Sequence, residues 1–183
     1  MRGQAALVCA LMLAASAGRA QVPNDPLVDT LLAELRAAPD EATAAALEER
    51  LHDIWQRAGS PAARLLLQHG VLDLQHNAAG EATEDFDSAL ALQPDYVEAY
   101  NDRAAARLLA GDTAGALRDI AQVLKREPRH FGALELLSHV AESRQEWKAA
   151  LDAWQKAMAL DPKTPDGQRR LNMLQQKAEG EPT

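Results

Sequence analysis

Three prolines in this chain recur at one fixed interval. Pro94, Pro128 and Pro162 each follow the one before by 34 residues. The residues ahead of each proline repeat in the same register, as small, bulky and small side chains: Ala82, Phe86 and Ala89; Ala116, Ile120 and Val123; Ala150, Trp154 and Ala157. This period is typical of helical repeats, in which one unit cannot bury its apolar face alone and must stack on its neighbours. The spacing therefore predicts an all-α, elongated stack.

Each repeat predicts two helices joined by a tight turn. The first helix carries a small residue at Gly70, Ala104 or Ser138, which lets the two helices of a unit approach closely. In the middle unit, Gly111 and Asp112 supply the turn and an N-cap for the second helix. Each proline then ends a second helix, because it has no amide donor and clashes with the preceding turn.

These units resemble the tetratricopeptide repeat (TPR) family. In that family the first helix carries a bulky and then a small residue, and the second carries alanine, an aromatic, alanine and a closing proline. The middle unit matches this pattern best, and the matching residues are Tyr100, Ala104, Gly111, Asp112, Ala116, Ile120, Val123 and Pro128. It departs from the pattern at Ile120, where the family has an aromatic, and the first unit has Asn77 where Gly111 stands in the second.

The resemblance covers more than half of the chain. It implies an α-α superhelix, or TPR solenoid, over residues 62–164, with three repeats at about 63–96, 97–130 and 131–164.

Both flanks of the repeats also predict helices. Residues 21–61 are expected to form a leading hairpin, with helices at about 26–37 and 41–58. Its residues Leu47, Leu51 and Ile54 are bulky where the repeats are small, so we interpret the hairpin as a degenerate unit that covers the end of the stack. Residues 165–178 predict an amphipathic capping helix, and 179–183 a disordered tail.

The first 20 residues have the pattern of a secretory signal peptide. A positive charge at Arg2 precedes an apolar run over residues 5–15, and small residues follow it. The run is too short to span a bilayer. Cleavage is expected after Ala20, or alternatively after Ala17, and would remove Cys9, the only cysteine. The signal predicts an exported protein, with the periplasm of a Gram-negative bacterium as the first choice of compartment and other secreted origins left open.

The charge of the chain limits its partners. The formal net charge is −8, and loss of the signal peptide would make the remainder more acidic. An acidic surface disfavours nucleic acid and anionic lipid as partners. No later stretch is apolar enough to predict a membrane span.

The sequence predicts no catalytic, cofactor-binding or metal-binding residues. No two of the five histidines are four residues apart, and no known catalytic or phosphate-binding motif occurs. Neighbouring carboxylates, such as Asp85 and Asp87, are expected on different faces of a helix. The chain is therefore predicted to have no enzymatic activity.

The family resemblance implies a binding groove lined by the first helix of each repeat. The residues expected on that face are Arg64, Leu67, Val71, Leu74, Glu98, Asn101, Ala105, Leu108, Glu135, His139 and Glu142. Such a groove would be apolar at one end and acidic at the other, which predicts another protein as partner, through a basic and apolar segment. An alternative is that Leu67, Val71 and Leu74 pack beneath the leading hairpin.

Some TPR proteins grip the carboxyl terminus of a chaperone with basic residues along this face. Here those places hold Leu67, Val71, Asp102, Gly132 and Leu136, so the resemblance does not extend to that activity. The leading hypothesis is a non-enzymatic adaptor of the bacterial cell envelope. The alternatives are a regulatory subunit of an envelope enzyme and a self-associating structural module.

Overall fold

The computed structural model describes residues 25–180, so the expected signal peptide and the last three residues of the expected tail lie outside the described residues. The described residues form helices and no strands, which confirms the all-α fold class. The helices are α1 (Pro26–Arg36), α2 (Glu41–Arg57), α3 (Pro61–Gln75), α4 (Ala79–Leu92), α5 (Val97–Leu109), α6 (Thr113–Arg126), α7 (Phe131–Ser143), α8 (Trp147–Leu160) and α9 (Gly167–Glu179).

Local sequence signals set several helix boundaries. The Ser60 hydroxyl caps α3 by accepting a hydrogen bond from the Ala63 amide at 3.3 Å, and Pro61 begins the helix. Asp112 caps α6 in the same way through the Gly115 amide at 2.8 Å. The Asp112 cap confirms the expectation from sequence.

The turn inside each helical pair needs a left-handed residue. Gly111 has a φ of 82°, and the residues one repeat before and after it, Asn77 and Gln145, have φ values of 60° and 61°. Asparagine tolerates this conformation better than most residues, which explains how Asn77 replaces glycine without changing the register.

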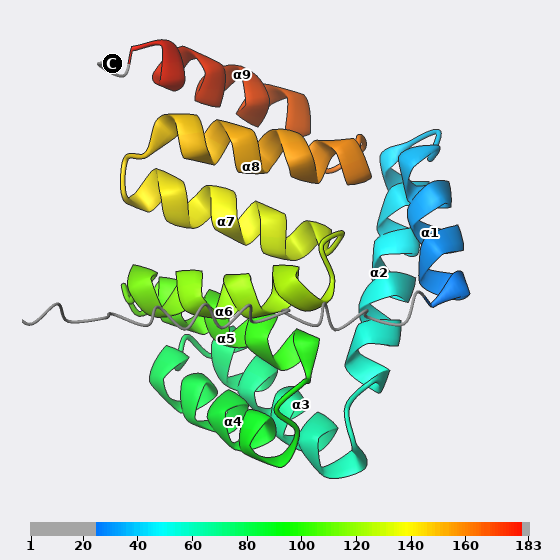
Figure 1. Cartoon of the computed structure of the whole chain (residues 1–183), viewed down its shortest axis with the longest axis vertical. Helices are drawn as coiled ribbons and strands as arrows, with labels where there is room; N and C mark the ends of the chain where they lie inside the picture. The colour runs from blue at the N-terminus through cyan, green and yellow to red at the C-terminus, as the bar shows by residue number, and fades with distance from the viewer. Residues whose placement is uncertain (1–24, 181–183) are drawn as a thin grey trace, which may run out of the picture.

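Three antiparallel pairs, α3–α4, α5–α6 and α7–α8, stack on one another, and α9 packs on α8 (Figure 1). The repeated columns form the core of this stack: the alanines at 82, 116 and 150 are fully buried, as are Phe86 and Ile120. Gly70 shows why its column must be small, because a Cβ there would lie 2.7 Å from the Phe86 ring.

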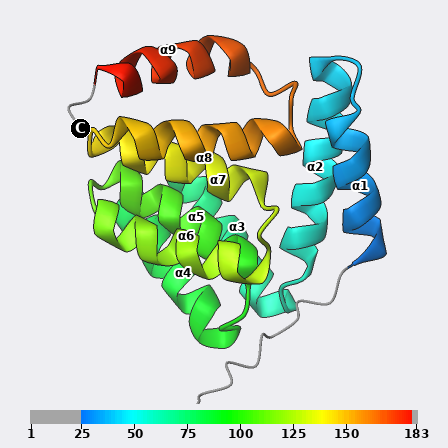
Figure 2. The same cartoon turned by 45° about the horizontal axis from the view of Figure 1, so that its top comes forward.

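The leading hairpin lies along the side of the stack rather than at its end. Figures 1 and 2 show α2 running across the repeat helices, from α8 toward α3. One apolar cluster joins Leu51 and Trp55 of α2 to Phe131 and Leu134 of α7, and Asp29 of α1 forms an ion pair with Arg129.

The prediction that the hairpin covers the end of the stack is therefore wrong. Its bulky residues, such as Leu47 and Leu51, do not permit the close helix approach that small residues allow within the stack. They pack instead against the ends of α7 and α8, where Leu134 and Leu160 also belong to the cluster.

The capping helix packs as expected but extends further. Leu174 is fully buried against the cluster that contains Trp154, and the Trp154 indole donates a hydrogen bond to the Gly167 carbonyl at 3.1 Å. Ala178 is also buried, which keeps the helix intact through Glu179. Glu179, which was expected to lie in the tail, is instead the last residue of α9. Within residues 25–180, no helix combines the length and apolar character needed to cross a membrane.

Candidate partner-binding surface

The middle of the expected groove is covered by α2. Glu98, in the first turn of α5, is only 2% exposed. Its Oε1 lies 2.9 Å from His52 Nδ1 on α2, and its Oε2 lies 3.0 Å from His130 Nε2. Asn101, one turn further along α5, is also buried. Glu98 and Asn101 therefore do not line an open groove, because the leading hairpin that was expected at the end of the stack lies over them.

The contact around Glu98 is a buried charge network. His130 caps α7 by accepting the Ala133 amide hydrogen at Nδ1, so its Nε2 carries the proton that is donated to Glu98. Trp55 of α2 stacks on the His130 ring with centroids 4.1 Å apart. Burial opposes ionisation of Glu98, but the hydrogen bonds from His130 and His52 outweigh it and lower its pKa to about 2.

Two ionisable residues of α2, His52 and Glu48, also have shifted pKa values. Burial disfavours the charged form of His52, but its hydrogen bond to Glu98 outweighs this and raises the His52 pKa. Further along α2, burial and the adjoining carboxylate of Asp161 raise the pKa of Glu48 to about 7. The side of α2 that faces the repeats thus places ionisable groups against the middle and third pairs.

The acidic residues at the other end of the expected groove form contacts within the molecule. Glu142 forms an ion pair with Arg170 of the capping helix, and Glu135 accepts a hydrogen bond from the Thr164 hydroxyl at 3.2 Å. His139 Nδ1 lies 3.0 Å from Arg170 Nη2, and burial together with the Arg170 charge lowers the His139 pKa. Burial also raises the pKa of Glu135.

Glu135, His139 and Thr164 line a hollow of about 610 Å³ between α7, α8 and α9. Its lining includes Arg169 and Arg170 of α9. Their position explains why this end is less acidic than expected: the cap brings cations to the carboxylates of α7.

The three residues predicted at the apolar end of the groove differ in how far they are buried. Leu67 is buried, whereas Val71 and Leu74 are partly buried and pack on the core of the first pair. Leu67 and Val71 line a hollow of about 340 Å³ with Gln56, Gln68 and Leu72, at the point where α2 leads into α3. The structure thus brings two of the three predicted apolar residues together beside α2.

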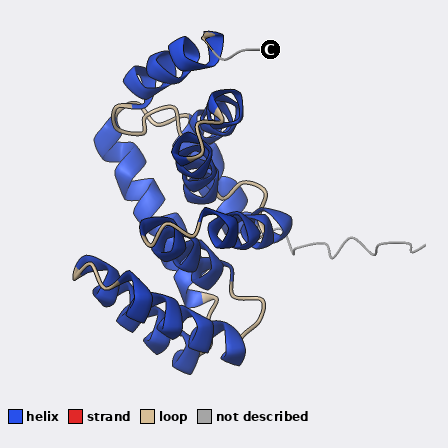
Figure 3. Ribbon diagram, turned by 90° about the vertical axis from the view of Figure 1, so that its left-hand side faces the viewer, coloured by secondary structure: helices blue, strands red, loops and turns tan. Residues whose placement is uncertain are grey.

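The remaining predicted residues lie nearby. Arg64 lines a smaller adjoining hollow with Asp53, Gln56 and Arg57 of α2. Ala105 is partly buried, and Leu108 packs against the core of the second pair. Figure 3 views the stack with the hairpin behind it and shows how the helical pairs curve.

The end face of the first pair was missed from sequence. Leu65 and Leu72 of α3 are 68% and 51% exposed. The residues one repeat later, Ala99 and Ala106, are fully buried where α4 packs on α5. The face is exposed because α2 does not stack on it. The sequence did contain a signal of this exposed face, because it has large leucines at positions where the next repeat has alanines.

Comparison with known proteins places the chain in a family, although no model of a protein family matches it. A TPR repeat-containing protein of Rhizobium etli is 33% identical over 158 residues, which cover 85% of this chain and 76% of the relative. The chain belongs to the TPR proteins. Mouse tetratricopeptide repeat protein 36 is 48% identical over 61 residues, covering 30% of this chain and 33% of that protein.

Solved TPR domains share the fold at low sequence identity. The first TPR domain of Spaghetti (RPAP3), bound to an HSP90 peptide, has a TM-score of 0.63 at 16% identity, covering 66% of this chain and 96% of that domain. The TPR2B domain of yeast Sti1, in complex with an Hsp70 peptide, has a TM-score of 0.58 at 20% identity, with coverage of 66% and 98%. TPR domains of this architecture therefore include peptide-binding modules.

Proposed function

We propose that this protein is a non-enzymatic TPR module that binds a segment of another protein at an uncovered apolar surface on α3. The observation that carries the proposal is the hollow formed by Leu67, Val71 and Leu72 with the end of α2, because Leu72 remains 51% exposed there. Exposed leucines beside a hollow are typical of a surface that a partner covers. The peptide complexes of other TPR domains support the same class of function.

The chemistry of the hollow favours an apolar segment that carries an acidic group. The sequence predicted a basic partner segment because Glu98, Glu135 and Glu142 were expected to be free in the groove. Each of these carboxylates instead forms a hydrogen bond or an ion pair within the molecule. In the adjoining hollow, Arg57 already forms an ion pair with Asp53, and Arg64 is the other charged residue of the lining. Among the described residues, no carboxylate lies within ion-pair distance of Arg64. A carboxylate of the partner would pair with Arg64 while its apolar residues cover Leu72.

The binding surface is tested with two matched variants. Leu72→Asp should abolish specific crosslinking of the protein to its partner in envelope preparations, because it places a charge in the apolar contact. Leu27→Asp is the control, since Leu27 is 50% exposed but lies on α1, away from the hollow. Equal loss of the crosslinked protein in both variants, or no loss in either, would contradict the proposed surface.

The role in the cell envelope is part of the proposal and is supported by the pattern of residues 1–20. The intact mass of the protein from the extracytoplasmic fraction should correspond to a chain that begins at Gln21 or Gly18. A chain that retains Met1 and is found in the cytoplasm would overturn the envelope assignment without affecting the proposed binding surface.

A further inference from the structure

The exposed end face of the first pair carries a compact cluster of possible metal ligands. His69 and Asp73 are four residues apart on α3 and so lie on the same face of that helix, and Asp85 faces them from α4. One ligand atom from each residue can be chosen so that all three lie within 4.8 Å of one another. His69 Nδ1 is hydrogen-bonded to Asp85 and lies 3.7 Å from Asp73 Oδ2.

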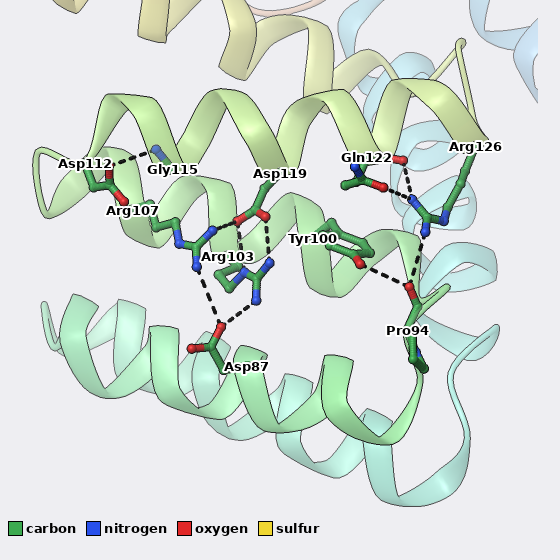
Figure 4. Close-up of polar contacts among 10 residues, drawn as sticks. All are labelled: Asp87, Pro94, Tyr100, Arg103, Arg107, Asp112, Gly115, Asp119, Gln122 and Arg126. Atoms are coloured by element: carbon green, nitrogen blue, oxygen red, sulfur yellow. Dashed lines mark hydrogen bonds and ion pairs between the residues drawn. The ribbon is translucent and has the colours of Figure 1, made fainter. Parts of the chain in front are cut away.

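The second pair shows what the repeat normally places at these positions. One repeat further along, His69, Asp73 and Asp85 correspond to Arg103, Arg107 and Asp119. Figure 4 shows the two guanidinium groups converging on Asp119, each at 2.7 Å, and turning also toward Asp87 of α4. In the second pair, therefore, two fixed positive charges neutralise the carboxylates.

The first pair has no such cations. An imidazole replaces Arg103, and a carboxylate replaces Arg107. In the part of the chain that the structure describes, the only basic side chain within ion-pair distance of Asp73 or Asp85 is His69. Two carboxylates held close together repel each other unless a positive charge is placed between them. The cluster thus lacks the positive charge that the same positions carry in the second pair.

We propose that His69, Asp73 and Asp85 bind a divalent transition-metal ion, with Zn²⁺ as the best-suited ion. One imidazole nitrogen and two carboxylate oxygens form a donor set that suits zinc, with water completing the coordination. Magnesium and calcium prefer oxygen ligands alone, so the imidazole disfavours them.

The cluster is open to solvent and is held by two packed helices. The His69 side chain is 67% exposed, because the leading hairpin lies elsewhere, so an ion can reach the cluster from solvent. Its ligands come from two helices of one tightly packed pair, and the bond between His69 and Asp85 already joins them. The ion would displace the proton that His69 and Asp85 share and would take the place of the guanidinium groups of the second pair.

Isothermal titration of the full chain with zinc sulfate tests the proposal. We expect one zinc ion per chain at this cluster. His69→Ala and Asp85→Asn should each lower the affinity by at least about 10- to 100-fold, since even the loss of a residue that only supports a metal ligand costs this much. His76→Ala is the matched control, because His76 is an exposed histidine at the end of the same helix and lies outside the cluster.

Thermal unfolding provides a second readout that depends on the folded site. Zinc should raise the melting temperature of the wild type and of His76→Ala but not of Asp85→Asn, a variant that keeps nearly the same shape. Zinc affinity no greater than that for magnesium, or unchanged in both His69→Ala and Asp85→Asn, would overturn the proposal. In that case the cation for these carboxylates would have to come from a lysine or arginine of a partner helix on the same face.

Discussion

Replacing Trp154 by alanine is expected to destabilise the protein by about 3–5 kcal/mol, as the deletion of large buried aromatic side chains does. Trp154 is 4% exposed and belongs to the cluster that joins α7, α8 and α9. Its indole donates to the Gly167 carbonyl, and the Arg170 guanidinium lies over its ring, 4.6 Å from the centroid. The variant therefore loses packing, a buried hydrogen bond and a cation–π contact together.

The loss should be concentrated at one end of the stack. In a repeat protein each unit contacts mainly its neighbours, so hydrogen exchange should show lost protection in α8 and α9 and retained protection in α3 and α4. Glu135→Ala is the control, because Glu135 is only partly buried and its carboxylate accepts one hydrogen bond, so its removal should leave the melting temperature almost unchanged. A uniform loss of protection along the chain, or equal destabilisation by Glu135→Ala, would show that our assignment of Trp154 as the local core residue is wrong.

The stack could be predicted because its signals are local and repeated. The 34-residue period gave the buried columns of Ala82, Ala116 and Ala150, and the caps at Ser60 and Asp112 follow from hydrogen bonds within a few residues. Such contacts depend on helix geometry alone, so a single sequence contains enough information to place them.

The position of the hairpin could not be obtained in the same way. It depends on contacts between residues far apart in the chain, such as Asp29 with Arg129 and Trp55 with His130, and no local pattern specifies them. The expected groove residues depended on this position, because a face that is open in a simple stack is closed when α2 lies over it. Glu98 is the clearest example. The repeat spacing predicted that it lies on the groove face of α5, but the spacing contained no sign that α2 would bury that face.

Replacing Glu98 by alanine is expected to destabilise the protein by about 2–4 kcal/mol at neutral pH. Glu98 is the common partner of His52 on α2 and His130 at the start of α7, and the variant leaves both histidines without a carboxylate. Breaking a buried ion pair generally costs more, but His52 can become neutral in the variant and His130 loses a single hydrogen bond, which limits the loss. Glu34→Ala is the control, because Glu34 is an exposed glutamate of α1 whose only ion pair within residues 25–180, with Arg50, is 3.9 Å long. Chemical denaturation of both variants measures the difference.

The pH dependence of this difference separates the charge network from simple packing. The Glu98 pKa is lowered from 4.5 to about 2 by its histidine partners, so its stabilisation is complete above pH 4.5 and is lost as the pH falls toward 2. The His52 pKa is raised from 6.5, so its contribution is complete below pH 6.5 and is lost as the pH rises through the raised value. The gap in unfolding free energy between wild type and Glu98→Ala should therefore be largest near pH 4.5 and should narrow on both sides. On the alkaline side Asp102 adds to the narrowing, because burial and the Glu98 charge raise its pKa in the wild type. Glu48, whose pKa is raised to about 7, is present in both proteins, so its direct contribution to the pH dependence should largely cancel in the comparison. A gap that stays constant from acid to alkaline pH would show that Glu98 stabilises the contact with α2 only by filling space.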